Sequence, residues 1–118
     1  MKVQRLSEDA LQKIIKGQAK PATCVIKFYS NGCDFCHALS EHYIDIAEDY
    51  EDVQFFAFNV DDAPNVADDL GLNGVPSISL VKTGRPSAKM KILDDPENPH
   101  QKTWYTSQYI KDFINKEK

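Results

Sequence analysis

"VIKFYSNGCDFC", from Val25 to Cys36, runs from an apolar segment directly into a pair of cysteines. The β-branched and aromatic residues at its start are typical of a buried strand. Two residues separate Cys33 from Cys36, and a C-x-x-C pair can exchange electrons with thiols, contribute to a metal site or attach a haem. The flanking sequence has to distinguish these three chemistries.

The sequence after the pair predicts an amphipathic helix and then a second strand. Apolar residues recur at steps of three and four from Cys36 to Tyr50, so we expect the helix to begin at or near Cys33. "VQFFAFNV", from Val53, has the composition of a strand. A strand–helix–strand order requires a crossover that makes the two strands parallel. The cysteine pair is therefore expected at the carboxyl end of a strand in an α/β sheet, where such sheets place their sites.

Further helices and strands are predicted on both sides of this unit. Ser7 is expected to cap a first helix, and a short helix is expected to begin near Pro64. "SISLVK" and "AKMKIL" are predicted to pair as a hairpin around the turn from Thr83 to Pro86. A last helix is expected to begin after a cap at Thr106 or Ser107.

Length and composition favour one globular domain over residues 1–118, because the chain is too short for two ordinary domains. Apolar residues make up 42% and charged residues 27%, and no apolar segment is long enough to cross a bilayer. The first seventeen residues include Glu8 and Asp9 and lack the apolar run of a secretory signal. We therefore expect a cytoplasmic protein that does not span a membrane.

The charge pattern argues against nucleic acid as a partner. The net charge is −4, and the stretch from Asn31 to Val81 has eleven carboxylates and no Lys or Arg, so it would repel a phosphate backbone. The carboxylates either keep helix surfaces solvated or form a docking face for a basic protein.

The context of the pair disfavours haem and metal. "CDFCH" fits a haem-attachment motif, but a strand leads into it and no export signal precedes it. A structural zinc site normally takes four ligands from two pairs, and the other candidates show no ligand spacing; they are Cys24, His37, His42 and His100. An iron–sulfur cluster shared by two chains stays an open alternative. We expect no metal and no cofactor other than a redox-active Cys33–Cys36 disulfide, and we expect Cys24 to act as a small buried hydrophobe.

Redox chemistry fits the predicted placement of the two sulfurs. Unpaired N–H groups at a helix N-terminus favour the thiolate of Cys33, which would attack a disulfide. Cys36 lies one turn further in on the apolar face, so it can resolve the mixed disulfide and release the substrate.

Four segments together resemble a thioredoxin over nearly the whole chain: "VIKFYSNGCDFC", "VQFFAFNVDD", "GVPS" about forty residues after the pair, and "VKTG". The resemblance implies a thioredoxin fold, with a central mixed sheet of about four to five strands and helices on both faces. It also implies a cis Val75–Pro76 bond against the cysteines, with the Val75 backbone pairing an incoming peptide. A monomer that acts on protein disulfides, with electrons from a reductase or from glutathione, is the corresponding expectation.

The sequence also departs from the thioredoxin pattern around the cysteines. Gly32 stands where thioredoxins usually have Trp, and Asp34-Phe35 replaces Gly-Pro. The negative charge of Asp34 would partly offset the stabilisation of the Cys33 thiolate by the helix N-terminus. Gly32 and Phe35 are expected in the substrate surface.

Two further positions are candidate modulators of the cysteine pair. Lys27 occupies the strand position where thioredoxins carry a buried acid that helps to deprotonate the second cysteine. It could stabilise a thiolate, or its stem could reach water. His37 could shuttle a proton, or it could point outward from the first helical turn.

The loop from Asp94 to Tyr105 is longer than the usual connection in a thioredoxin. Our hypothesis is that Trp104 supplies substrate surface; the alternative is that Trp104 and Tyr105 pack beneath the last helix. For the whole protein we predict dithiol reduction of protein disulfides. A disulfide isomerase or oxidant, and a thioredoxin-like binding module with secondary catalysis, are the alternatives.

Overall fold

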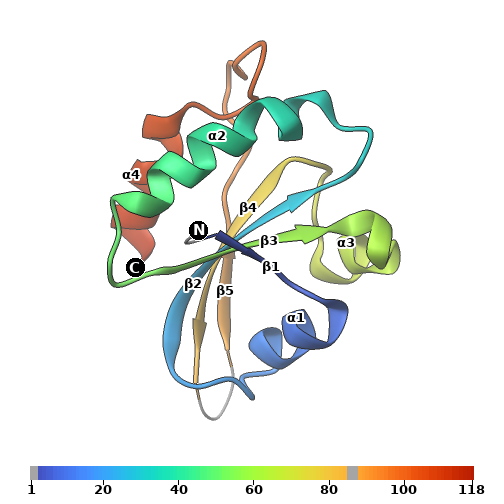
Figure 1. Ribbon diagram of the computed structural model, residues 1–118, viewed down its shortest axis with the longest axis vertical. Coiled ribbons are helices and arrows are strands. Elements are labelled where there is room, and N and C mark those ends of the chain that lie inside the picture. The colour runs from blue at the N-terminus through green and yellow to red at the C-terminus, as the bar shows by residue number, and fades with distance from the viewer. Residues whose placement is uncertain (1–2, 85–87) are drawn as a thin grey trace.

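The computed structural model describes residues 3–84 and 88–118, which form a five-stranded sheet with helices on both faces (Figure 1). In chain order the elements are β1 (Val3–Arg5), α1 (Glu8–Ile15), β2 (Ala22–Tyr29), α2 (Asp34–Glu48), β3 (Gln54–Asn59), a 3-10 turn (Val60–Asp62), α3 (Asn65–Leu70), β4 (Ser77–Thr83), β5 (Lys89–Ile92) and α4 (Ser107–Glu117).

The sheet has the strand order β1-β3-β2-β4-β5 and is mixed. The strands β1, β3 and β2 are parallel, whereas β4 is antiparallel to both β2 and β5. The strand that leads into the cysteines, β2, lies at the centre. The predicted α/β thioredoxin fold, with four to five strands and helices on both faces, is confirmed.

Alternating residues of β2 contribute to two hydrophobic cores. Val25 packs with apolar residues of α2 and α4 on one face of the sheet. Ile26 and Phe28 pack with apolar residues of α1 and α3 on the other face. Figure 1 shows the same division, with α2 and α4 together on one side and α1 and α3 on the opposite side.

The predicted helix starts are found in the structure. The Ser7 side chain accepts a hydrogen bond from the Ala10 N–H, and the Thr106 side chain accepts one from the Tyr109 N–H. Cys33 is the N-cap of α2. Local capping chemistry therefore fixes where these three helices begin.

Two elements were not predicted. The strand β1 has one apolar residue, Val3, and forms because the edge of β3 is open to pair with it, with Val3 opposite Phe55. The 3-10 turn begins after Asn59, whose side chain accepts from the Asp61 N–H. The predicted hairpin of β4 and β5 is present, but residues 85–87 of its turn lie outside the described residues.

We predict that Tyr43→Phe lowers the free energy of unfolding by about 1–2 kcal/mol. The Tyr43 side chain is 1% exposed, and its hydroxyl lies 2.7 Å from the Phe56 carbonyl oxygen and 3.1 Å from that of Val25. Removing the hydroxyl leaves buried carbonyl groups of two strands without this donor. Denaturant unfolding measures the loss.

The matched control for this prediction is Tyr109→Phe. The Tyr109 hydroxyl donates to the Asp94 carbonyl oxygen at an exposed position, where water can replace it. An equal loss of stability in both variants would contradict the role assigned to Tyr43.

Candidate active site

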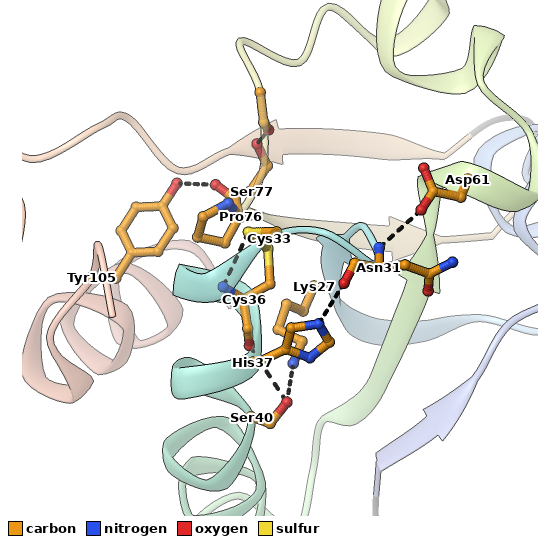
Figure 2. The surroundings of a disulfide bond; sticks show 11 residues. Lys27, Asn31, Cys33, Cys36, His37, Ser40, Asp61, Pro76, Ser77 and Tyr105 are labelled. Atoms are coloured by element: carbon orange, nitrogen blue, oxygen red, sulfur yellow. Dashed lines mark hydrogen bonds between the residues drawn. A yellow bond between two sulfur atoms is a disulfide. The ribbon is translucent and has the colours of Figure 1, made fainter. Parts of the chain in front are cut away.

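Cys33 and Cys36 form a disulfide at the N-terminus of α2, with their Cα atoms 5.2 Å apart (Figure 2). Cys33 is half-buried, whereas Cys36 is 1% exposed and faces the core. The Cys33 sulfur accepts a hydrogen bond from the Cys36 N–H at 3.1 Å. The helix end thus directs an N–H donor at Cys33, an arrangement that favours negative charge on this sulfur after reduction.

A polar network that sequence reasoning missed fixes the loop before Cys33. The Asn31 N–H donates to the Asp61 carboxylate at 2.8 Å, and the Asn59 side chain donates to the Asn31 side chain at 2.8 Å. Asn59 is 3% exposed, at the end of β3 beside the end of β2. A polar residue at the carboxyl end of the neighbouring parallel strand was the signal that could have found it.

His37 lies on the outer side of the same loop. Its Nε2 is 2.8 Å from the Asn31 carbonyl oxygen, which can only accept, so Nε2–H donates. The ring is exposed, in agreement with the outward-pointing alternative. This contact orients the loop that carries Gly32 and Cys33.

Pro76 lies at the sheet edge that carries the cysteines, and the Val75–Pro76 bond is cis. Ser77 pairs with Phe28 near the end of β2, and Figure 2 shows the Pro76 ring beside Cys33. Val75 is partly exposed, and the Pro76 carbonyl oxygen accepts from the buried Tyr105 hydroxyl at 3.4 Å. The cis bond implied by the resemblance is therefore present next to the disulfide.

Trp104 contacts Phe35, the second of the two residues between the cysteines. Their rings meet edge to face with centroids 5.4 Å apart, and both side chains are partly buried. The Trp104 indole N–H donates to Asp95 at 3.1 Å. Tyr105 is buried in the core that α4 covers, and the partly buried Trp104 packs against the same core. The long loop therefore brings an aromatic residue to the cysteine pair.

Lys27 lies beneath α2 and does not reach water, since its side chain is only 5% exposed. Its Nζ donates to the Ser40 hydroxyl at 3.2 Å and lies over the rings of Tyr29 and Tyr43. Burial lowers the pKa of Lys27 to about 8. The structure therefore contradicts the alternative in which its stem carries the charge to solvent.

Cys24 lies at the other end of β2 from the disulfide. It is 2% exposed, and burial raises the pKa of its thiol to about 11, so it stays protonated at neutral pH. It lines a cavity of about 750 Å³ between α1 and the sheet. This cavity shares no lining residue with the surroundings of Cys33.

Within residues 3–84 and 88–118, no group of three or more His, Cys, Asp or Glu side chains could hold a metal ion. In the same part of the chain, none of the helices combines the length and apolar character needed to cross a bilayer.

The thioredoxin family model matches residues 2–99. Thioredoxin AMT13 of Alternaria alternata is 29% identical over 83 residues, which are 66% of this chain and 70% of that protein. Thioredoxin Asp f 28 of Aspergillus fumigatus is 28% identical over 79 residues, which are 67% of this chain and 73% of that protein. The crystal structure of chloroplastic thioredoxin z superimposes with a TM-score of 0.71 at 19% identity, covering 98% of this chain and 94% of that one.

We predict that Lys27→Met stabilises the oxidised protein at pH 7 by about 1–3 kcal/mol. At this pH the ammonium group is charged in both the folded and the unfolded chain, so folding carries the full desolvation penalty. Between pH 8 and the ordinary value of 10.5 the folded chain loses the proton first, so its stability rises with pH. When the Lys27→Met variant and the unsubstituted protein are unfolded from pH 7 to pH 10.5, the difference between their free energies of unfolding should decrease. A difference that stays constant over this range would contradict a lowered pKa at Lys27.

Proposed function

The chain belongs to the thioredoxin family, whose members are thiol–disulfide oxidoreductases, and we propose that it acts as a dithiol reductant of disulfides in other proteins. The observation that supports this most is the position of the sulfurs: Cys33 is half-buried at a helix start, while Cys36 is buried one turn deeper. The Cys33 sulfur can contact a disulfide of a substrate protein, which we call the client, whereas the Cys36 sulfur can contact only that of Cys33.

The reaction proceeds by two exchanges. The Cys33 thiolate attacks one sulfur of the client disulfide, so that a mixed disulfide forms and the other client sulfur leaves as a thiolate. Cys36 then attacks the Cys33 sulfur, which releases the second client thiolate and forms the Cys33–Cys36 disulfide. The client gains two electrons and the protein loses two. A reductase or glutathione returns them, and no other cofactor takes part.

The client face consists of Gly32, Phe35, Val75 and Pro76, extended by Trp104. The Val75 backbone pairs with an extended client segment, and Phe35 and Trp104 offer an apolar edge to a side chain near the client cysteine. Gly32 leaves open space where a larger side chain would stand, because a Cβ there would have no heavy atom within 4 Å. A monomer in the cytoplasm, where thiols are kept reduced, suits this role.

The direction of electron flow separates the proposal from its main alternative, a disulfide isomerase or oxidant. Asp34 adds a negative charge in the first turn of α2 and so disfavours the Cys33 thiolate. The reduction potential decides between them: a value near −270 mV, about that of thioredoxin, indicates a reductant, and one near −120 mV an oxidant.

We predict that Cys36→Ser traps a mixed disulfide between Cys33 and a client such as insulin, while Cys33→Ser forms none. Without a resolving thiol the first exchange cannot be completed, so turnover should fall at least about a hundredfold in both variants. Non-reducing electrophoresis and mass spectrometry identify the linked cysteine.

The control for these variants is Cys24→Ala, which should keep full turnover because Cys24 lies at the far end of β2. Trapping through Cys36, or an unimpaired cellular role for Cys33→Ser, would contradict the enzymatic proposal. The second outcome would favour the binding-module alternative.

We predict that Trp104→Ala lowers kcat/KM for protein disulfides by about tenfold, because the client loses an aromatic contact. Reduction of a small disulfide such as hydroxyethyl disulfide should change little, since it does not reach the loop. Equal losses on both substrates would mean that Trp104 supports the geometry of the disulfide rather than the client.

A further inference from the structure

Lys27 is the one charged side chain that is buried among the described residues. It projects from the centre of β2 toward the face covered by α2, and it lines a crevice of about 210 Å³ that Cys36 and Ser40 also line. Figure 2 shows Lys27 beneath the first turns of α2, close to Cys36, His37 and Ser40. A buried cation is unfavourable for stability, so its position in the crevice that Cys36 also lines calls for a function.

The inner cysteine needs a proton acceptor that bulk water cannot provide. Cys36 is 1% exposed, and burial in apolar surroundings disfavours a thiolate. Its thiol must nevertheless lose a proton before the sulfur can attack the mixed disulfide. A titratable group in the crevice that Cys36 lines is therefore the candidate for this acceptor.

The other titratable groups of the crevice are less suited to the task. Tyr29 and Tyr43 present ring faces to the Lys27 amine, and the Tyr43 hydroxyl contacts backbone carbonyl oxygens. His37 is exposed, and its Nε2–H donates to the Asn31 carbonyl oxygen. β1 and β3 contribute only Val3 and Ala57, and none of the described residues lining the crevice carries a carboxylate.

We propose that Lys27 is the proton acceptor for Cys36 during resolution and that its ammonium form then stabilises the Cys36 thiolate. This inference rests on the proposed function, because it concerns the second exchange of that reaction. Ser40 is the positioning residue, since it accepts from the amine at 3.2 Å while its own hydroxyl donates to the Cys36 carbonyl oxygen at 3.4 Å.

The step balances within the site. The neutral form of the Lys27 amine, which is the minority form at pH 7 and grows as the pH approaches 8, takes the proton of the Cys36 thiol, giving an ammonium and a thiolate. The thiolate attacks the Cys33 sulfur, the bond between Cys33 and the client breaks, and the client sulfur leaves with the electron pair. That thiolate then takes a proton from Lys27 or from water. Burial lowers the pKa of Lys27 to about 8, so part of the protein carries a neutral amine near neutral pH that can accept this proton.

A positive charge beside Cys36 also affects the equilibrium of the pair. The ammonium stabilises the thiolate, which exists only in the reduced protein, so Lys27 shifts the pair toward the reduced form. The effect is reciprocal: reduction should raise the affinity of Lys27 for its proton.

The first test uses the unsubstituted protein. The pKa of Lys27 is measured by nuclear magnetic resonance of its side chain in the oxidised and in the reduced state. We expect a higher pKa after reduction, by about one pH unit. An identical pKa in both states would overturn the proposal.

The second test compares Lys27→Met with Lys82→Met, which removes the same charge at an exposed position on β4. In a Cys24→Ala/Cys33→Ser background, thiolate absorbance gives the pKa of Cys36. Lys27→Met should raise that pKa by about one pH unit, and in the two-cysteine protein it should shift the glutathione equilibrium about tenfold toward the disulfide. Ser40→Ala should act in the same direction and more weakly, and Lys82→Met should change neither quantity.

Unchanged values in Lys27→Met would assign the lysine a purely structural role and overturn the proposal. These measurements need no client. If the protein fails to reduce insulin but Lys27→Met still raises the pKa of Cys36, the proposed function alone is refuted. If the protein reduces insulin normally but Lys27→Met leaves the pKa of Cys36 unchanged, this inference alone is refuted.

Discussion

The packing of α2 on the sheet is the constraint on which the rest of the structure depends. Leu39, Tyr43 and Ile46 bury one face of the helix against β2 and β3, and this fixes the rotation of the helix about its axis. With that rotation set, Cys36 points inward and Cys33 remains at the helix start. The two sulfurs differ in exposure because of packing about one to three turns further along the helix.

The surroundings of the disulfide combine opposite electrostatic influences. The helix N-terminus favours negative charge on sulfur, and in our proposal the buried Lys27 does so as well, while Asp34 opposes it. In this chain a cation occupies the strand position where the resemblance leads one to expect an acid. We propose that the balance of these charges, rather than the fold, sets the redox behaviour of the pair, so family membership alone does not give the direction of electron flow.

Much of the fold and of the site could be predicted from sequence because the signals were local. Caps at Ser7 and Thr106, the apolar period of α2 and the "GVPS" segment each reside in a few consecutive residues. The missed features depend on contacts across the chain. β1 exists because an edge of β3 is open to it. Trp104 was expected at the substrate surface, but its direct contact with Phe35 joins the long loop to the first turn of α2 and has no local signal. The burial of Lys27 depends on the helix above it.

The account rests on the claim that α2 leaves the Cys33 sulfur accessible and buries the Cys36 sulfur. Alkylation of the reduced protein with a limiting amount of reagent tests this most directly. The protein is treated at neutral pH with less than one equivalent of iodoacetamide, and the modified cysteine is identified by mass spectrometry. The account predicts modification at Cys33, with Cys36 and Cys24 left as thiols. Modification of Cys36 as fast as Cys33 would contradict it.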